Sequence, residues 1–67
     1  MSIAKISEIS AQSSKSFEDA LQQGILRASK TIRNIQSAWI KEQQVEVEDG
    51  RIVAYRVNLL VTFVLED

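Results

Sequence analysis

The sequence predicts a small α+β fold of β-α-β-β order, in which one helix covers an antiparallel sheet of three strands. Three features of the 67 residues predict it: a β-branched N-terminal stretch, a single helical pattern of apolar residues, and two runs on either side of Asp49-Gly50. A chain of this length forms one domain, residues 1–67, and buries only about 60% of its unfolded surface. Without cysteine for a disulfide and with 45% hydrophobic residues, it is typical of a subunit completed by other copies.

The first strand is expected over residues 3–9, where β-branched residues recur although their alternation is imperfect. Residues 10–16 are rich in serine and predict a polar loop, because serine side chains bond to nearby backbone.

A helix is expected to start after Ser16, whose hydroxyl is a good N-cap, with Asp19 in the first turn. Gly24 lies in the middle of the apolar stripe, so we expect it to allow close approach of the helix to the sheet. The basic residues Arg27, Lys30 and Arg33 are placed toward the negative end of the helix dipole. The stripe itself recurs at three- and four-residue spacing and consists of Phe17, Leu21, Gly24, Ala28, Ile32 and Ile35.

The second half of the chain predicts a hairpin whose two-residue turn is Asp49-Gly50, a pair that favours a type I′ turn. If Glu48 faces Arg51, all later pairs follow from the same register, and the last strand extends from residue 51 to about residue 65. The predicted pairs are Val47 with Ile52, Val45 with Ala54, Gln43 with Arg56, Lys41 with Asn58, Trp39 with Leu60, Ala38 with Val61, Ile40 with Leu59, Glu42 with Val57 and Gln44 with Tyr55.

One helix covers only one face of this sheet. The face expected beneath the helix carries Val53, Tyr55, Val57, Leu59, Val61, Phe63 and Leu65. The other face would expose Trp39, Val45, Val47, Ile52, Leu60 and Val64. Because an exposed apolar face of that size normally marks an interface, self-association is expected, the alternative being a partly wet face on a monomer.

The composition excludes most enzyme classes. Histidine and cysteine are absent, and with Gly24 and Gly50 as the two glycines there is no phosphate-binding loop. A net charge of −1 argues against nucleic-acid binding, and no apolar run approaches the ~20 residues of a membrane helix. The N-terminus lacks a secretory pattern. We therefore expect a non-enzymatic cytoplasmic protein with neither nucleic acid nor membrane as a partner.

Four segments, which keep their mutual spacing, resemble the dodecin family: residues 13–20 (SSKSFEDA), 28–35 (ASKTIRNI), 47–52 (VEDGRI) and 55–59 (YRVNL). The resemblance covers nearly the whole chain. It implies a subunit whose sheet wraps around the helix, with twelve copies forming a hollow homododecamer. It also implies a non-enzymatic role in binding flavin (riboflavin or FMN), which flavin-binding dodecins hold between aromatic side chains at subunit interfaces.

The resemblance also indicates where a ligand would bind. The tryptophan that stacks on flavin in the family corresponds to Ser37, and the glutamine that bonds the flavin edge corresponds to Arg56. Trp39 lies two residues beyond Ser37, hence on the same face, and Gln43 is expected opposite Arg56. The candidate ligand-binding residues are therefore Trp39, Arg56, Ser37 and Gln43. Arginine in place of the glutamine resembles a dodecin subgroup associated with calcium.

Several alternatives stay open from the sequence. Trp39 is either a stacking platform or an interface hydrophobe, and Arg56 with Gln43 forms either a ligand rim or an interface contact. The acidic run is either solvated or bridged by a hard cation such as calcium where copies meet; it comprises Glu42, Glu46, Glu48 and Asp49. Flavin storage thus competes with a structural or calcium-stabilised shell, and with an adaptor that recruits a protein through its sheet edge.

Overall fold

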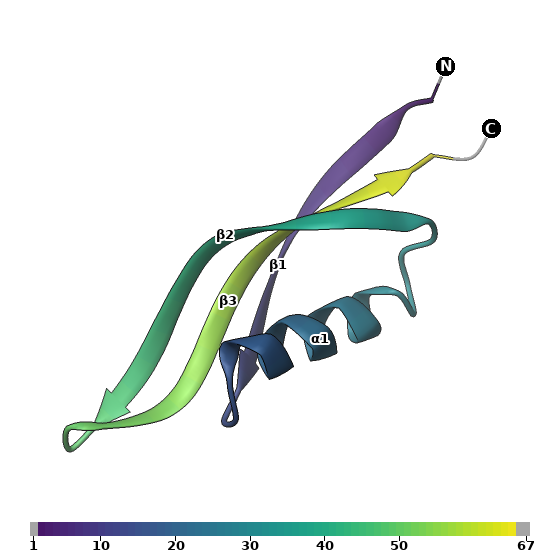
Figure 1. Cartoon of the computed structure of the whole chain (residues 1–67). Helices are drawn as coiled ribbons and strands as arrows, with labels where there is room; N and C mark the ends of the chain where they lie inside the picture. The colour runs from purple at the N-terminus through teal and green to yellow at the C-terminus, as the bar shows by residue number, and fades with distance from the viewer. Residues whose placement is uncertain (1, 66–67) are drawn as a thin grey trace.

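The computed structural model describes residues 2–65 and shows four elements: β1 (Ala4–Ser13), α1 (Phe17–Ala28), β2 (Ile35–Glu48) and β3 (Arg51–Val64). The strands form one antiparallel sheet in the order β1-β3-β2, so the last strand is central. The predicted β-α-β-β architecture is confirmed. Figure 1 shows α1 under one face of the sheet, which bends along its length.

The first strand is longer than the sequence predicts. Residues 10–13, expected in a loop, continue β1 and pair with β3 as far as Ser13 opposite Tyr55. The loop prediction was wrong there because ladder bonds to β3 outweigh the local preference of serine for turns. The last residue of the strand is buried, and its hydroxyl donates to Asp19 Oδ2 at 2.6 Å while accepting from the Lys15 N–H at 2.9 Å.

The helix begins as predicted and ends earlier. Ser16 Oγ accepts a hydrogen bond from the Asp19 N–H at 2.9 Å, which confirms the N-cap. The helix stops at Ala28, where Ser29 Oγ donates to the Ile25 carbonyl at 2.8 Å, and Asn34 at φ 62° then turns the chain into β2. The predicted stripe was therefore too long: Ile32 and Ile35 follow the helix, as do Lys30 and Arg33, and only Arg27 lies in its last turn.

The helix packs closely on the sheet at one point. A Cβ built on Gly24 would lie 2.9 Å from the Cβ of Ala11, so the predicted close approach is confirmed. Phe17 anchors the start of the helix by packing edge-on against Tyr55, with ring centroids 5.2 Å apart. The fully buried residues at the centre are Ala20, Val57, Leu59 and Val61.

The hairpin turn is confirmed, because Asp49 (φ 51°) and Gly50 (φ 74°) both have left-handed backbone, as a type I′ turn requires. The register starts as predicted, with Glu48 opposite Arg51 and Val47 opposite Ile52. Val53 then has no partner and shifts the pairing by one residue.

This bulge makes the predicted pairs of residues 41–46 wrong, and it turns Val45, predicted on the uncovered face, to the helix-facing side opposite Tyr55. The structure instead pairs Glu42 with Asn58, Gln43 with Val57, Gln44 with Arg56, Val45 with Tyr55 and Glu46 with Ala54. A second irregularity at Lys41 restores the predicted register, so that Trp39 lies opposite Leu60, Ile40 opposite Leu59 and Ala38 opposite Val61. A third irregularity lies between Ile35 and Ser37, and bulges of this kind bend a strand and increase its twist.

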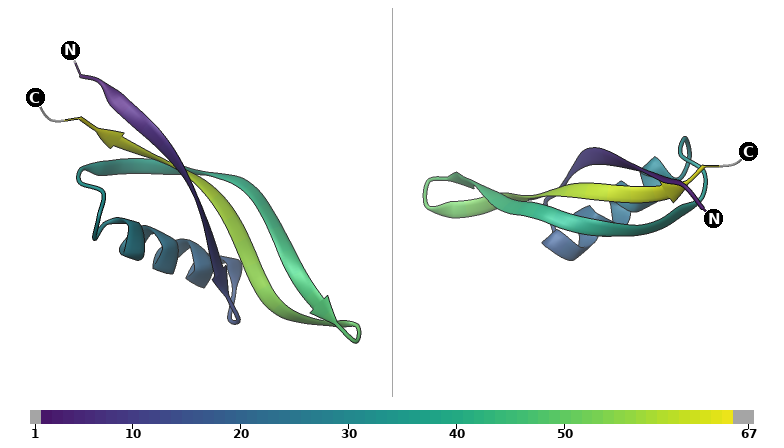
Figure 2. Two further views of the ribbon diagram at one scale, coloured as in Figure 1. Left: turned by 180° about the vertical axis from the view of Figure 1, so that it is seen from behind. Right: turned by 90° about the horizontal axis from the view of Figure 1, so that it is seen from above.

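The sheet is much longer than the helix that covers it. The chain is 51 Å along its longest axis, whereas a 12-residue helix is about 18 Å long. Figure 2 shows strands extending past both ends of α1. The predicted covered face is therefore buried only in its middle, and Val53 and Leu65 at its ends are exposed.

Candidate functional site

The candidate site lies on the face of the sheet turned away from α1, which we call the open face. Strand alternation and the pairing register place three rows of residues on it. The β1 row is Ile6, Glu8, Ser10 and Gln12; the β2 row is Ser37, Trp39, Glu42, Gln44 and Glu46; and the β3 row is Ala54, Arg56, Asn58, Leu60 and Thr62.

One end of the open face is apolar. Trp39 lies opposite Leu60 and is 58% exposed, which is unusual for the one tryptophan of a small domain. Thr62 separates Ser37 from Ile6, and Ile6 is also exposed. The small side chain of Ser37 therefore lies next to Trp39 on this face. Trp39, Leu60 and Ile6 form the exposed apolar surface.

The rest of the open face is polar, starting with Glu8 opposite Leu60, and its charges are paired across the strands. Lys41 Nζ lies 3.3 Å from Glu8 Oε1, so this ion pair crosses β3 from one edge strand to the other. Asn58 Nδ2 donates to Glu42 Oε1 at 3.1 Å. These contacts are solvent-exposed, and exposed ion pairs stabilise a fold by only about 0–1 kcal/mol each.

Arg56 links all three strands. Its Nη2 donates to Gln12 Oε1 of β1 at 2.7 Å and to Glu46 Oε1 of β2 at 3.3 Å. Its Nε donates to the same Gln12 oxygen at 3.2 Å. The guanidinium is therefore held by the protein's own side chains, and its charge is balanced by a carboxylate.

Three of the four predicted ligand residues share the open face, and one does not. Ser37 and Trp39 are neighbours on it, while Arg56 lies four positions along β3 from Leu60, about 13 Å away. Gln43 lies opposite Val57 on the helix-facing side, so its predicted pairing with Arg56 was wrong. Gln44 takes that position because of the bulge at Val53.

The sequence did not point to the two partners of Arg56. Gln12 lies in a segment expected to be loop, and Glu46 faces Arg56 only after the register shift. No pattern of residue types in the sequence marks either feature. In the described part of the chain, no three acidic side chains lie close enough together to hold a metal ion.

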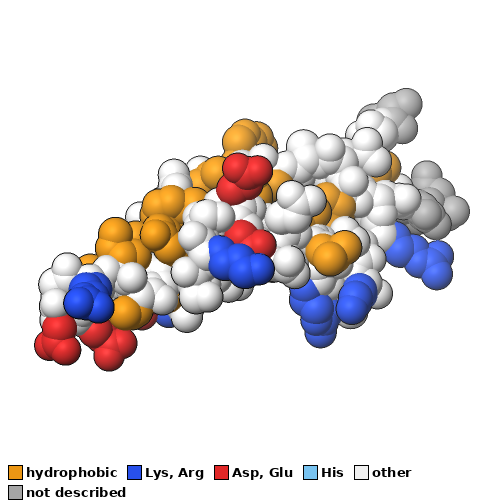
Figure 3. Space-filling model, turned by 60° about the horizontal axis from the view of Figure 1, so that its bottom comes forward, with side chains coloured by type: hydrophobic (Ala, Val, Ile, Leu, Met, Phe, Trp, Pro, Cys, Tyr) orange, Lys and Arg blue, Asp and Glu red, His pale blue; other side chains and the backbone are white. Residues whose placement is uncertain are grey.

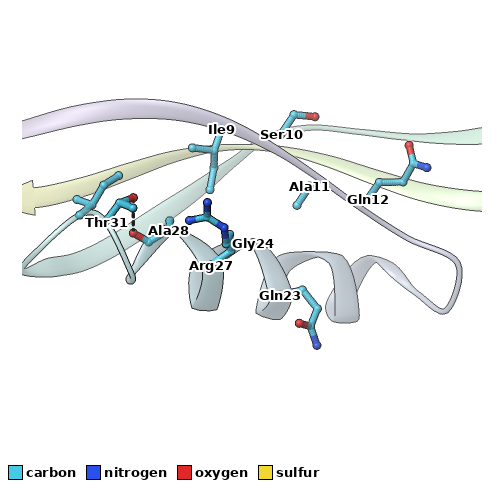
Figure 4. A pocket seen from close by; sticks show the side chains of 10 residues that line it. Ile9, Ser10, Ala11, Gln12, Gln23, Gly24, Arg27, Ala28 and Thr31 are labelled. Atoms are coloured by element: carbon cyan, nitrogen blue, oxygen red, sulfur yellow. Dashed lines mark hydrogen bonds between the residues drawn. The ribbon is translucent and has the colours of Figure 1, made fainter.

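A groove runs between α1 and β1 on the other side of the sheet (Figure 4), with a volume of about 410 Å³. Its floor is formed by aliphatic and small residues, with Arg27 and Thr31 at its rim. Ser10 and Gln12, although adjacent to the groove, point away from α1 in Figure 4. The residues of the floor are Ile9, Ala11, Gly24, Ala28 and Ile32. None of the helices in residues 2–65 has the length and apolar character needed to cross a membrane.

Comparison with known proteins gives consistent matches. The chain is 32% identical over 63 residues to the calcium dodecin of Mycobacterium tuberculosis, which covers 94% of this chain and 89% of that protein. The structure superposes on the dodecin from Streptomyces davaonensis with a TM-score of 0.94 and 27% identity, covering 98% and 97% of the two chains. A Thermus thermophilus protein matches with a TM-score of 0.94 and 30% identity, covering 100% of this chain and 98% of the other.

The family model named Dodecin matches residues 3–66, which is almost the entire sequence. The order of the elements, the antiparallel sheet and the single helix agree with the solved dodecin structures. The chain therefore belongs to the dodecin family.

Proposed function

We propose that twelve copies of this chain form a closed shell that binds a planar flavin, riboflavin or FMN, on the open face between subunits. The bound flavin is stored or sequestered in the cytoplasm and is not chemically changed. The observation that carries this proposal is the 58% exposure of the Trp39 indole ring on an apolar surface.

Trp39 is left exposed by the elements of residues 2–65. Trp39, Ile6 and Leu60 lie together at the apolar end of the open face, and no element among residues 2–65 packs over them. Burial of a large aromatic side chain contributes strongly to an interface, because it removes roughly 150–250 Å² of surface from water. That burial would be provided by a second copy of the chain, by a planar ligand, or by a ligand held between two copies.

The residues of the open face favour a flat ligand with a polar edge. An indole ring favours offset stacking with a flat aromatic system, and Ser37 beside it leaves room for a ring over the sheet. Arg56 offers donors only and is already bonded to Gln12 and Glu46. Gln44, which lies opposite Arg56, carries an amide that both donates and accepts. We therefore assign stacking to Trp39 and contact with the polar edge of the flavin to Gln44 alongside Arg56.

Titration tests this function directly. We expect riboflavin to quench the fluorescence of Trp39 with saturation, and riboflavin polarisation to rise in step. Trp39→Phe should retain weaker binding by polarisation, whereas Trp39→Ala should abolish it, because alanine has no π-face. Riboflavin polarisation that stays flat at tens of micromolar protein would contradict the flavin proposal.

A calcium-stabilised shell is the second candidate, and it is supported by the similarity to a relative named calcium dodecin. Within one chain the described residues do not form a site for a hard cation. The carboxylates of Glu42, Glu46 and Glu48 would have to meet those of other copies around a symmetry axis. A chelator should then lower the thermal midpoint of the wild-type assembly and added calcium should restore it, since a bound ion stabilises the state that binds it. An unchanged midpoint would exclude this candidate.

A further inference from the structure

We infer that the tip of the β2–β3 hairpin in one copy docks into the groove between α1 and β1 of another copy. The hairpin tip is residues 47–53, and the groove is the one described above, with Arg27 at its rim. This inference rests on the proposed self-assembly, and it identifies the contact through which the copies recognise each other.

Charge is divided unevenly along the chain. Between residues 20 and 41 every charged residue is basic, and between residues 42 and 50 every charged residue is acidic. Figure 3 shows acidic side chains at the hairpin end with a basic side chain beside them, further acidic side chains near the middle, and several basic side chains on the other half. The basic residues are Arg27, Lys30, Arg33 and Lys41, and the acidic residues are Glu42, Glu46, Glu48 and Asp49.

Part of this charge is neutralised within the chain. Lys41 pairs with Glu8, and Glu46 pairs with Arg56. No ion pair within residues 2–65 involves Arg27 or Arg33 on the helix side, or Glu48 or Asp49 at the hairpin tip. The unpaired charges on the helix side are basic, whereas the tip carries two carboxylates and one guanidinium, that of Arg51, so the two surfaces complement each other in net charge between copies.

The hairpin tip also carries exposed apolar side chains between its carboxylates. Val47 is 58% exposed and Ile52 is 53% exposed, and Val53, displaced by the bulge, is exposed as well. Figure 1 shows that the tip extends well past the N-terminal end of α1, where no element covers it. The tip therefore presents aliphatic side chains beside two carboxylates, Glu48 and Asp49, and one guanidinium, Arg51, with a net negative charge.

The groove presents the matching surface. Its floor of Ile9, Ala11, Gly24, Ala28 and Ile32 is apolar, and Arg27 reaches from α1 toward β1 beside it in Figure 4. A second hollow of about 370 Å³ shares Thr31 and Ile32 with this groove and adds Arg33. The aliphatic floor is therefore flanked by two arginines, which complement the net negative charge of the tip.

The two surfaces are different, so each copy gives its tip to one neighbour and its groove to another. The tip also projects away from the helix of its own chain. Contacts between two different surfaces generate rings when the rotation closes. A closed shell built from such rings agrees with the proposed assembly.

Charge reversal tests the contact. One variant carries Arg27→Glu with Arg33→Glu, and the other carries Glu48→Lys with Asp49→Asn, since asparagine tolerates the left-handed backbone at residue 49. Each should raise the concentration at which half the chains are assembled by about tenfold or more, as followed by light scattering on dilution. The chain that carries all four substitutions should recover most of the loss, because the reversed charges attract again.

Lys15→Glu, an exposed loop residue outside both surfaces, is the matched control and should assemble like the wild type. Circular dichroism of each variant establishes that it is folded. Wild-type-like assembly of both reversed variants overturns the inference, and so does failure of the fourfold variant to recover. Normal assembly of the Arg27/Arg33 variant combined with lost retention on heparin would assign the basic surface to a polyanion and overturn it too. A monomeric wild type would overturn the proposed assembly together with this contact.

Discussion

The guanidinium of Arg56 donates two hydrogen bonds to the amide oxygen of Gln12, from Nη2 at 2.7 Å and from Nε at 3.2 Å. The same guanidinium lies 3.3 Å from a carboxylate oxygen of Glu46. A residue of the central strand thereby ties both edge strands together on the open face. Arg56, one of the residues predicted to contact the ligand, is thus already bonded within its own chain.

Replacing Arg56 by glutamine should increase the affinity for riboflavin by about tenfold, which corresponds to roughly 1.4 kcal/mol. Glutamine both accepts and donates hydrogen bonds, whereas arginine only donates. Riboflavin polarisation measures the change, and Arg56→Met, of similar length and without hydrogen-bonding groups, is the control. Equal riboflavin affinities of the glutamine and methionine variants would contradict this prediction, because the amide at residue 56 would then contribute nothing to binding.

Replacing Gly24 by alanine should lower stability by about 1 kcal/mol. The added Cβ would meet the Cβ of Ala11 at 2.9 Å, and such overpacking costs about 1–3 kcal/mol, against a gain of about 1 kcal/mol in helix propensity. The thermal midpoint measures the loss. Gln22→Ala, at an exposed position of the same helix outside the groove, should leave the midpoint unchanged or raise it. A more stable Gly24→Ala variant would show that helix and sheet separate easily at this point.

Replacing Gly50 by alanine should destabilise the hairpin by about 1–2 kcal/mol. Nothing lies within 4 Å of a Cβ at this position, so alanine meets no steric clash with other residues. The cost comes from the backbone, because φ of +74° is unfavourable for alanine. Asp49→Asn replaces one residue that tolerates left-handed backbone by another, so it should leave the thermal midpoint nearly unchanged. If the two variants melt alike, the turn does not impose the conformation described above.

Local signals in the sequence predicted several features correctly. Asp49-Gly50 predicted the turn, Ser16 predicted the helix start, and Gly24 predicted the close approach of helix and sheet. Each of these depends on residues close together in the chain or on one steric requirement. They were sufficient for the order of the elements and for the central pair of Trp39 and Leu60.

Features that depend on distant parts of the chain were not predictable in the same way. The bulge at Val53 lies near the hairpin tip, past the end of α1, and the alternation of residue types does not reveal it. Its effect on the candidate site is direct, because it exchanges Gln43 for Gln44 opposite Arg56. The full length of β1 likewise depends on pairing with β3, which offers a partner as far as Tyr55.

The central claim is that other copies of the chain cover the open face. Light scattering of the wild type and of Leu60→Glu, which places a charge next to Trp39, tests it most directly. We expect the wild type to have a mass near twelve times that of the 7.6 kDa chain, and the variant to dissociate into much smaller species. A well-folded wild type with the mass of one chain would contradict the account, as would a Leu60→Glu variant that keeps the full mass.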